Sequence, residues 1–482
     1  MFIILCLIGI MSFIRYKRFG NKEYAYEVET YWDPEAKRPR QKTKYLGVVV
    51  DKEKKIFERP RQKPREKLIL DFGDGYLVQE FLKQKGLSEL IRDIFGKKAD
   101  EVMVLLCYRL CQGGAMRHLP LWLEGNINRI LFQAVKLTSQ RISRLLKQIG
   151  EETKQRDFFK RYVSNYAKCS DGIIIDSTAL PNEIDMGLSS WGYGDSSIEM
   201  QIRLVCVVDR ASGMPVYYRY TGGNIVDVSV FNTTIDELRH IGIQSSFVLV
   251  DAGFFSEDNI REMHRKGIDY LIRLPASRRI YKDLIKKYSH EMEKACNAVR
   301  FGKRILFIRQ EQVELYGREV HAYIVLDPER KGREVKRLML EAIEDGRVKE
   351  ESIEYELARR GIMILLSSFE IEGEEVVPLY YMRVKVEQLF GFSKDDLTLL
   401  PLRVHKEETL RGYLFLMFLT LVVFTMLRKG LQNKYTVEEA LMCMRNLKCK
   451  VFDKEVLVGE TSKQQKEILS LLNIIVPKKV GI

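Results

Sequence analysis

The chain has 482 residues, more than one ordinary hydrophobic core can organise, so several modules are expected. Lys and Arg total 79 against 66 Asp and Glu, and the formal net charge of +13 suits a polyanionic partner. The eight cysteines and six histidines show no zinc-ligand spacing. We therefore expect reduced core cysteines, as in a cytoplasmic protein, and no disulfide framework.

Two strands are predicted near the start of the chain, over residues 24–31 and 42–50, within a module of residues 1–66. A basic segment from Lys37 to Lys67 overlaps the second strand and holds thirteen basic and four acidic residues, a net charge of +9. Such a segment attracts phosphate backbones through counterion release. It equally suits a solubilising linker, because the prolines of residues 59–65 exclude a helix or a central strand there. Both interpretations stay open.

A helical region is predicted over residues 67–165. Apolar residues recur at 3.6-residue spacing over residues 76–95, 99–110 and 139–166. The last of these helices begins at good capping residues and carries exposed arginines, as a helix that enters a DNA groove would. An ordinary helix of a bundle is the alternative, and the sequence favours it slightly.

From residue 171 the pattern changes to alternating strands and helices. Strands are predicted near residues 171–177, 201–209, 214–221, 246–251 and 269–274, and helices near residues 227–240 and 256–266.

Two of these strands end in an aspartate. Residues 172–176 and 247–251 are apolar up to Asp176 and Asp251, which is typical of strands buried on both faces. A carboxylate at the mouth of a dry core needs a partner, and a divalent cation is the commonest partner that also performs chemistry. For either aspartate alone, the start of a loop or the cap of the next helix is the plainer interpretation.

A third polar group lies on a helix predicted to begin near Pro378, a residue that suits the first helical turn. Its apolar stripe consists of Leu379, Met382, Val386, Leu389 and Phe390. Four polar positions beside the stripe fall within about 60° of one another if the helix continues past Gly391, namely Tyr380, Arg383, Glu387 and Lys394. Seen alone, an exposed ion pair between Arg383 and Glu387 would explain this face.

The spacing of the three acids predicts an insertion. Asp251 follows Asp176 by 75 positions, whereas Glu387 follows Asp251 by 136, far more than one strand and one connection require. We expect the insertion over residues 276–365.

Two apolar stretches, Met1–Ile14 and Tyr413–Leu427, are shorter than the roughly 20 residues that a bilayer requires. The first is followed, not preceded, by basic residues, unlike a signal peptide. The second is predicted to be a buried helix that covers the sheet. We expect no membrane segment.

The string Tyr380-x2-Arg383-x3-Glu387-x6-Lys394 resembles the Y-(2)-R-(3)-E-(6)-K signature of DDE transposases from prokaryotic insertion sequences of the insertion-sequence-4 type. All four residues stand at the family spacing, which makes the match specific.

Other segments extend the resemblance over roughly residues 166–430. Residues 174–178 and 250–254 look like the family's first-acid and second-acid segments. Residues 220–224, followed by Asp227, are similar to its glycine-asparagine turn.

The resemblance implies an α/β fold, with a ribonuclease H-like catalytic core interrupted by a mainly β insertion and preceded by a β hairpin and a helical DNA-binding region. The expected parts are a β hairpin with the basic segment (1–66), a helical DNA-binding region (67–165), the first part of the core (166–275), the insertion (276–365), the second part of the core (366–430) and a helical tail (431–482).

The resemblance also implies a mechanism. Asp176, Asp251 and Glu387 would be the catalytic residues and would hold two Mg²⁺ ions, or Mn²⁺ in their place, about 3.5 to 4 Å apart. Water would first cut the element ends, and the freed 3′-hydroxyl would then attack target DNA. Tyr380, Arg383 and Lys394 would bind DNA, with Arg383 suited to a bidentate phosphate grip. The partners would be double-stranded DNA, with its terminal inverted repeats and target, and a second copy of the chain. A cytoplasmic location is expected.

Two alternative functions share the acids. A ribonuclease H-type nuclease would need neither the basic module nor the Tyr-Arg-Lys set. A catalytically inactive DNA-binding descendant of a transposase is disfavoured because all three acids are present. A membrane-associated protein would rest only on the two short apolar stretches.

Overall fold

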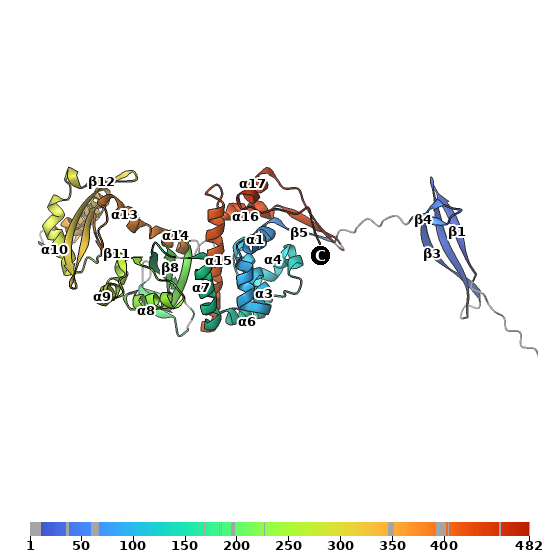
Figure 1. Cartoon of the computed structure of the whole chain (residues 1–482), viewed down its shortest axis with the longest axis horizontal. Coiled ribbons are helices and arrows are strands. Elements are labelled where there is room, and N and C mark those ends of the chain that lie inside the picture. The colour runs from blue at the N-terminus through green and yellow to red at the C-terminus, as the bar shows by residue number, and fades with distance from the viewer. Residues whose placement is uncertain are drawn as a thin grey trace, which may run out of the picture. The chain divides into compact units, whose positions relative to one another are not determined.

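The structure is a computed structural model that describes residues 11–34, 38–58, 67–167, 169–182, 184, 186–193, 198–225, 227–345, 351–391, 402, 404–452 and 455–481. The chain divides into two compact units, and Figure 1 labels their elements. The first unit is Met1–Leu68 with Phe452–Lys454, and the second is Ile69–Val451 with Glu455–Ile482.

The first unit contains a four-stranded antiparallel sheet. Its strands, in spatial order, are β1 (Met11–Phe19), β2 (Lys22–Asp33), β3 (Arg38–Asp51) and β4 (Ile56–Glu58). The two predicted strands lie inside β2 and β3, whereas β1 and β4 were not predicted. β1 adds to the sheet because it pairs with β2 along its full length. Residues 38–44 of β3 are all exposed, and residues 59–66 of the basic segment lie outside the described residues.

The centre of the second unit is a ten-stranded mixed sheet. Its strands are β6 (Ile173–Pro181), β7 (Ser190–Tyr193), β8 (Ile198–Asp209), β9 (Pro215–Gly222), β10 (Phe247–Val250), β11 (Asp269–Arg273), β12 (Ala298–Phe301), β13 (Arg304–Leu315), β14 (Arg318–Leu326) and β15 (Ile362–Ser367). They follow the order β12-β13-β14-β15-β11-β10-β6-β8-β7, and β9 pairs with β8. β6 and β11 both run parallel to β10, while the other pairings described are antiparallel.

The apolar runs explain where the central strands lie. Every residue of β10 and residues 173–176 of β6 are buried, as expected for strands covered on both faces. The five predicted strands correspond to β6, β8, β9, β10 and β11, whereas β7, β12 and β15 were not predicted. The predicted helices are α8 (Asp227–His240) and α9 (Glu257–Lys266), and the 3-10 turn η3 (Ala252–Phe254) follows β10.

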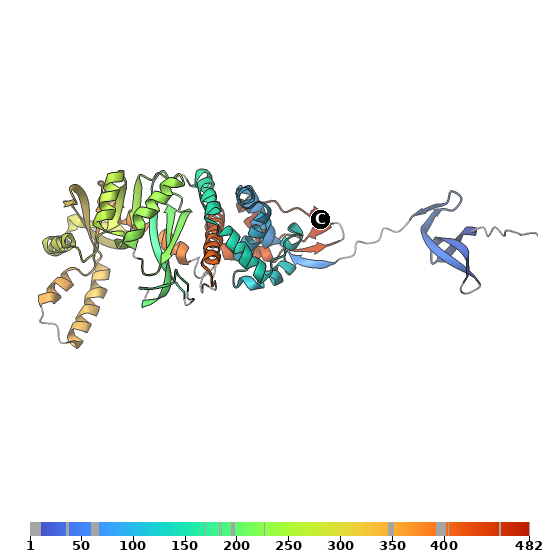
Figure 2. The ribbon, with the colours of Figure 1, turned by 90° about the horizontal axis from the view of Figure 1, so that it is seen from below.

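The insertion is mixed α/β, so the prediction of a mainly β insertion was wrong. Its helical elements are α10 (Arg279–Tyr288), η4 (Ser289–Glu291), η5 (Ala295–Asn297), α11 (Pro328–Glu344) and α12 (Glu351–Ala358). The strands β12 to β14 extend the central sheet, because β14 pairs with β15 and β15 pairs with β11. Figure 2 shows α11 and α12, coloured yellow to orange, projecting from the sheet.

The helical region contains α1 (Gly73–Gln84), α2 (Leu87–Phe95), η1 (Gly96–Lys98), α3 (Ala99–Cys111), η2 (Met116–His118), α4 (Leu119–Gly125), α5 (Asn128–Leu131), α6 (Ser139–Ile149) and α7 (Glu152–Tyr166). Two predicted helices are each broken at a glycine. Gly86 separates α1 from α2 with a left-handed φ of 71°. Gly150 separates α6 from α7, and a Cβ there would lie 2.6 Å from the carbonyl oxygen of Glu408.

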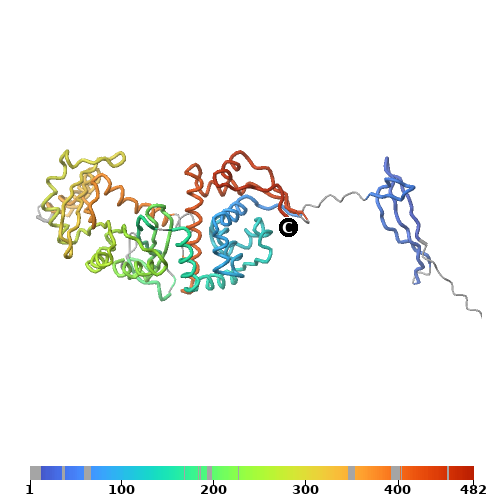
Figure 3. The backbone as a smooth tube through the Cα atoms, in the orientation of Figure 1, coloured from blue at the N-terminus to red at the C-terminus, as the bar shows by residue number. Residues whose placement is uncertain are grey.

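The C-terminal segment packs against the start of the second unit, and the prediction of a purely helical tail was wrong. It contains α16 (Val437–Arg445), β16 (Lys448–Val451), β17 (Glu455–Val458), α17 (Lys463–Leu471) and β18 (Lys479–Gly481). These strands and β5 (Leu68–Asp71) form a small sheet in the order β18-β17-β16-β5. The amide of Phe72 donates to the carbonyl of Leu447, and Figure 3 shows the red C-terminal chain beside the blue α1 region.

The helix α15 (Glu407–Gly430) is longer than the predicted apolar stretch. Its length and composition would allow it to cross a membrane, but most of its apolar window is buried inside the protein, as in the core helix of a soluble protein. It contacts β9 of the central sheet and α3 and α6 of the helical region, and therefore lies between them (Figure 1).

Candidate active site

Two strands place the aspartates side by side. β6 and β10 are parallel neighbours in which Val250 is paired with Ile175. Asp176 is the next residue of β6, and Asp251 directly follows β10 and begins the η3 turn. Because the two strands run in the same direction, both carboxylates lie at the same level of the sheet. β10 ends there as predicted, whereas β6 does not end at Asp176 but continues to Pro181, because its later residues pair with β8.

The polar helix differs from its prediction. Pro378 lies inside α13 (Gly373–Tyr381), not at its start, and a second helix, α14 (Val384–Gly391), follows a break. At the break the amide of Arg383 donates to the carbonyl of Tyr380, a bond between residues three apart. Such a tightened turn places residues i and i+3 on one face, so Tyr380 and Arg383 lie together.

Arg383 joins the three acids. Its Nη2 donates to Oδ2 of Asp176 at 3.0 Å and to Oε1 of Glu387 at 3.1 Å. Its Nη1 lies 3.1 Å from Oδ1 of Asp251. The side chains of Asp176, Asp251 and Glu387 are 10%, 32% and 55% exposed, so the cluster is open to solvent on the Glu387 side.

Tyr380 is part of this cluster but is buried, contrary to the prediction that it lies beside the packed stripe. Its hydroxyl donates to Oδ1 of Asp251 at 2.7 Å and accepts from Nη1 of Arg383 at 3.0 Å. Burial, together with the charge of Asp251, raises the pKa of Tyr380. The phenol therefore stays protonated and orients the second carboxylate.

Burial and charge shift the pKa values of the cluster residues. Burial raises the pKa of Asp176 above its usual range, although the Arg383 guanidinium opposes this shift. Burial acts to lower the pKa of Arg383, but the charges of Asp176 and Asp251 outweigh it and the pKa is raised. Arg383 is therefore a permanent cation among three carboxyl groups.

The donor chemistry of the site fits a divalent metal ion. Carboxylate oxygens are the protein ligands that Mg²⁺ and Mn²⁺ prefer. Within the described ranges no three His, Cys, Asp or Glu side chains are close enough to hold one ion together, and the guanidinium of Arg383 contacts each of the three carboxylates. Lys394, the remaining predicted site residue, lies outside the described residues.

Sequence reasoning missed one residue at this edge of the sheet. Arg203, on β8, donates from Nη1 to Ser177 Oγ at 3.2 Å and forms an ion pair with Asp227 at the same distance. Asp227 follows the glycine-asparagine turn, which was the only signal in the sequence, while nothing around Arg203 singled it out.

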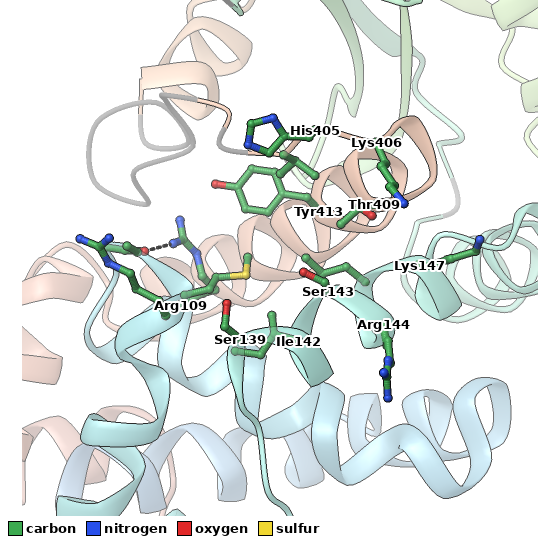
Figure 4. Close-up of a pocket in the computed structure, with 16 residues that line it drawn as sticks. Arg109, Ser139, Ile142, Ser143, Arg144, Lys147, His405, Lys406, Thr409 and Tyr413 are labelled. Carbon is green, nitrogen blue, oxygen red and sulfur yellow. Dashed lines mark hydrogen bonds between the residues drawn. The ribbon is translucent and has the colours of Figure 1, made fainter. Parts of the chain in front are cut away.

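A separate cavity of about 710 Å³ lies in the helical region (Figure 4). It is formed by α6, the loop after α3 and the start of α15. Its cationic lining residues are Arg109, Arg117, Arg144, Lys147 and Lys406, and none of the described residues that line it is acidic. The predicted site residues did not include this surface, although α6 begins the helix for which entry into a DNA groove was left open.

Among solved structures, the chain is similar to the piggyBac transposase synaptic complex with hairpin DNA, with 10% identity and a TM-score of 0.43 over 78% of this chain and 70% of that chain. It is also similar to the Drosophila P element transposase strand transfer complex, with 11% identity and a TM-score of 0.14 over 65% of this chain and 86% of that chain. With TM-scores below 0.5, neither likeness bears on the fold. A comparison with curated proteins finds no match.

The decisive comparison is with a protein family. The family model described as the transposase DDE domain matches residues 167–423, which is more than half of the chain and contains all three clustered acids. The chain therefore belongs to the transposase DDE domain family, whose members are metal-dependent enzymes that cleave DNA.

Proposed function

We propose that this transposase cuts DNA at the ends of its element and joins the freed ends to target DNA at the cluster of Asp176, Asp251 and Glu387. One observation carries the proposal: acids from three segments far apart in the chain meet around the guanidinium of Arg383. Carboxylates beside a buried sheet need cationic partners. Arg383 is one such partner, and a divalent metal ion is the partner that would also perform chemistry.

The same three residues would hold two Mg²⁺ ions, with Mn²⁺ as a substitute. When bound, the metal would activate the attacking oxygen and stabilise the leaving oxygen of a phosphodiester. Asp176 is held within β6 and by the amide of Ser177, which donates to it at 2.9 Å. Glu387 is the most exposed of the three acids, so DNA would approach from its side.

The other residues of the signature would bind and position the DNA strand; they are Tyr380, Arg383 and Lys394. Arg383 is a fixed cation next to the acids, and its planar fork suits a bidentate contact with phosphate. Tyr380 would keep Asp251 oriented through its 2.7 Å hydrogen bond. Lys394 is assigned to phosphate binding from the signature spacing alone.

We infer a ribonuclease H-like core and an origin in a prokaryotic insertion sequence of the insertion-sequence-4 type. The spatial order β9-β8-β6-β10-β11, with the first acid on the central strand, supports the core assignment. The spacing of Tyr380, Arg383 and Glu387, and their joint contact with the aspartates, supports the type.

Double-stranded DNA is the proposed partner, with contacts beyond the cluster. The cavity of the helical region has cations from α6 and α15 and no acid among its described lining residues (Figure 4), which suits a phosphate backbone. The exposed basic half of β3 in the first unit is a second candidate surface. A homodimer on DNA is proposed on the family resemblance alone, and a cytoplasmic location on the cysteine pattern, which predicts reduced thiols.

The test uses the purified full chain and duplexes that contain the element's own ends. Cleavage at the ends followed by joining to a plasmid, with Mg²⁺ or Mn²⁺ and not with EDTA, is the expected result. Cleavage of an RNA–DNA hybrid in preference to these duplexes would identify a ribonuclease H-type nuclease. End binding without cleavage in either metal would identify an inactive descendant.

A further inference from the structure

The glycine-asparagine turn, residues 222–224, leads to an aspartate that the proposed chemistry does not use. Asp227 is the first residue of α8, and its side chain is 14% exposed. Its carboxylate accepts hydrogen bonds from Nη1 of Arg203, at 3.2 Å on Oδ1 and 3.3 Å on Oδ2. A carboxylate at a helix N-terminus is ordinarily explained by the helix dipole alone, so the other contacts of Asp227 decide its role.

Those contacts lead to both aspartates of the cluster. The same Nη1 of Arg203 donates to the hydroxyl of Ser177, the residue after Asp176. On the other side, the carboxylate of Asp227 lies against Gly253, two residues after Asp251: a Cβ added at Gly253 would be 2.8 Å from Oδ2. Arg203 and Asp227 thus connect the chain just after the first acid with the turn just after the second.

The surrounding backbone leaves these groups little freedom. The buried side chain of Asn259 donates to the carbonyl of Val228 at 3.0 Å and to that of Phe254 at 2.9 Å, which ties the start of α8 to the η3 turn. The turn before α8 is equally confined, because a Cβ at Gly223 would lie 2.4 Å from the carbonyl oxygen of Gln201 on β8.

We propose that Arg203 and Asp227 form a clamp that sets the distance and orientation of Asp176 relative to Asp251, and thereby the affinity of the site for its divalent metal. The clamp residues are positioning residues and do not touch the reacting atoms. The proposal rests on the proposed function, because it assumes that the two aspartates hold the metal. Partners that orient metal ligands in this way typically change metal affinity or activity about 10- to 100-fold when mutated.

The variants are Asp227→Asn, Arg203→Gln and Gly253→Ala. Gly253→Ala retains both charges and pushes the turn away from Asp227. The matched control is the pair Arg304 and Asp327, an Arg–Asp ion pair of 2.8 Å in the insertion. Asp327 also stands at a helix N-terminus, where it caps α11, so Asp327→Asn removes the same kinds of interaction far from the acids in the sequence.

Three quantities are measured for each variant: Mn²⁺ binding without DNA by electron paramagnetic resonance, the metal concentration for half-maximal cleavage, and the melting temperature. The expected result is at least a tenfold weaker Mn²⁺ affinity and a matching shift in half-maximal metal for all three clamp variants, with end binding unchanged within about twofold. Asp327→Asn should lower the melting temperature and leave both metal readouts unchanged.

Unchanged metal readouts in Asp227→Asn, or an equal change in Asp327→Asn, would overturn the clamp and leave an ordinary helix cap. If Asp227→Asn does not fold, the metal readouts of Gly253→Ala test the clamp instead, because this variant keeps both residues of the ion pair. If the unmodified protein neither binds Mn²⁺ nor cleaves DNA, the proposed function fails. If it does both and the clamp variants match it, only the clamp fails.

Discussion

Nη2 of Arg383 and Oδ2 of Asp176 lie 3.0 Å apart, although 207 positions separate the two residues in the chain. The bond joins the signature helix pair to the central strand of the sheet. Arg383 was expected on a polar helix face beside the packed stripe, but it lies inside the acid cluster and is only 12% exposed. Its replacement should therefore affect folding as well as chemistry.

The acids themselves are tested by isosteric changes. Asp176→Asn, Asp251→Asn and Glu387→Gln should each abolish strand cleavage while end binding persists, because each removes a metal ligand and little volume. Gel-based cleavage and binding assays measure both quantities. Any of the three variants that cleaves at the unmodified rate would remove its residue from the site.

Arg383→Ala should lower both cleavage and stability. It leaves three carboxylates without their shared cation, at a cost of about 3 kcal/mol in the free energy of unfolding. Arg383→Lys keeps the positive charge but loses the planar guanidinium, so it should lower cleavage and stability less than Arg383→Ala does. Lys394→Ala should lower cleavage with no change in melting. Denaturant unfolding would contradict this account if Arg383→Ala were as stable as the unmodified protein.

The apolar face of α14 is tested by an inserted charge. Val386 is fully buried, so Val386→Asp should cost about 4 kcal/mol. Met382 was predicted to lie on the same stripe but is half-buried at the helix break, and Met382→Asp should cost about 1 kcal/mol. Equal thermal melts for the two variants would mean that the helix is oriented differently.

The contact between α15 and α6 depends on a glycine. A Cβ at Gly412 would lie 1.8 Å from the carbonyl oxygen of Leu146, so Gly412→Ala should cost about 1 to 3 kcal/mol. Gly332 provides the control, because it is exposed within α11 and a Cβ there meets nothing within 4 Å. Gly332→Ala should stabilise the protein by about 0.5 to 1 kcal/mol. Chemical denaturation should give a lower free energy of unfolding for Gly412→Ala, and a higher one for Gly332→Ala, than for the unmodified protein.

The exposed half of β3 is tested through salt. Its basic residues are Arg38, Arg40, Lys42 and Lys44. Replacing all four by Gln should flatten the log-log salt dependence of DNA binding by about 0.9 for each phosphate that the protein no longer neutralises. Replacing Arg144 and Lys406 of the cavity by Gln gives the parallel measurement for the helical region. An unchanged slope in the β3 variant would identify that segment as a linker.

Local patterns account for what could be predicted. The strands β6, β8, β9, β10 and β11 and the helices α8 and α9 follow apolar runs and periodicities that lie within a few consecutive residues. The helix breaks at Gly86 and Gly150 were not predicted, because an isolated glycine interrupts the apolar period only weakly. Among the missed strands of the C-terminal segment, β16 pairs with β5, which lies almost 400 positions away, and no local pattern encodes that contact.

By itself, the sequence determined that two aspartates directly follow buried apolar runs and that Tyr380, Arg383 and Glu387 are spaced to share a helical face, because hydrophobic periodicity is encoded locally. Only the tertiary structure decided that Tyr380 is buried against Asp251, that Arg383 contacts all three acids, and that Arg203 connects Ser177 to Asp227. Those contacts depend on strand order, register and the tightened turn before α14. Each is set by the burial of the whole core, and no short segment of the chain carries that information.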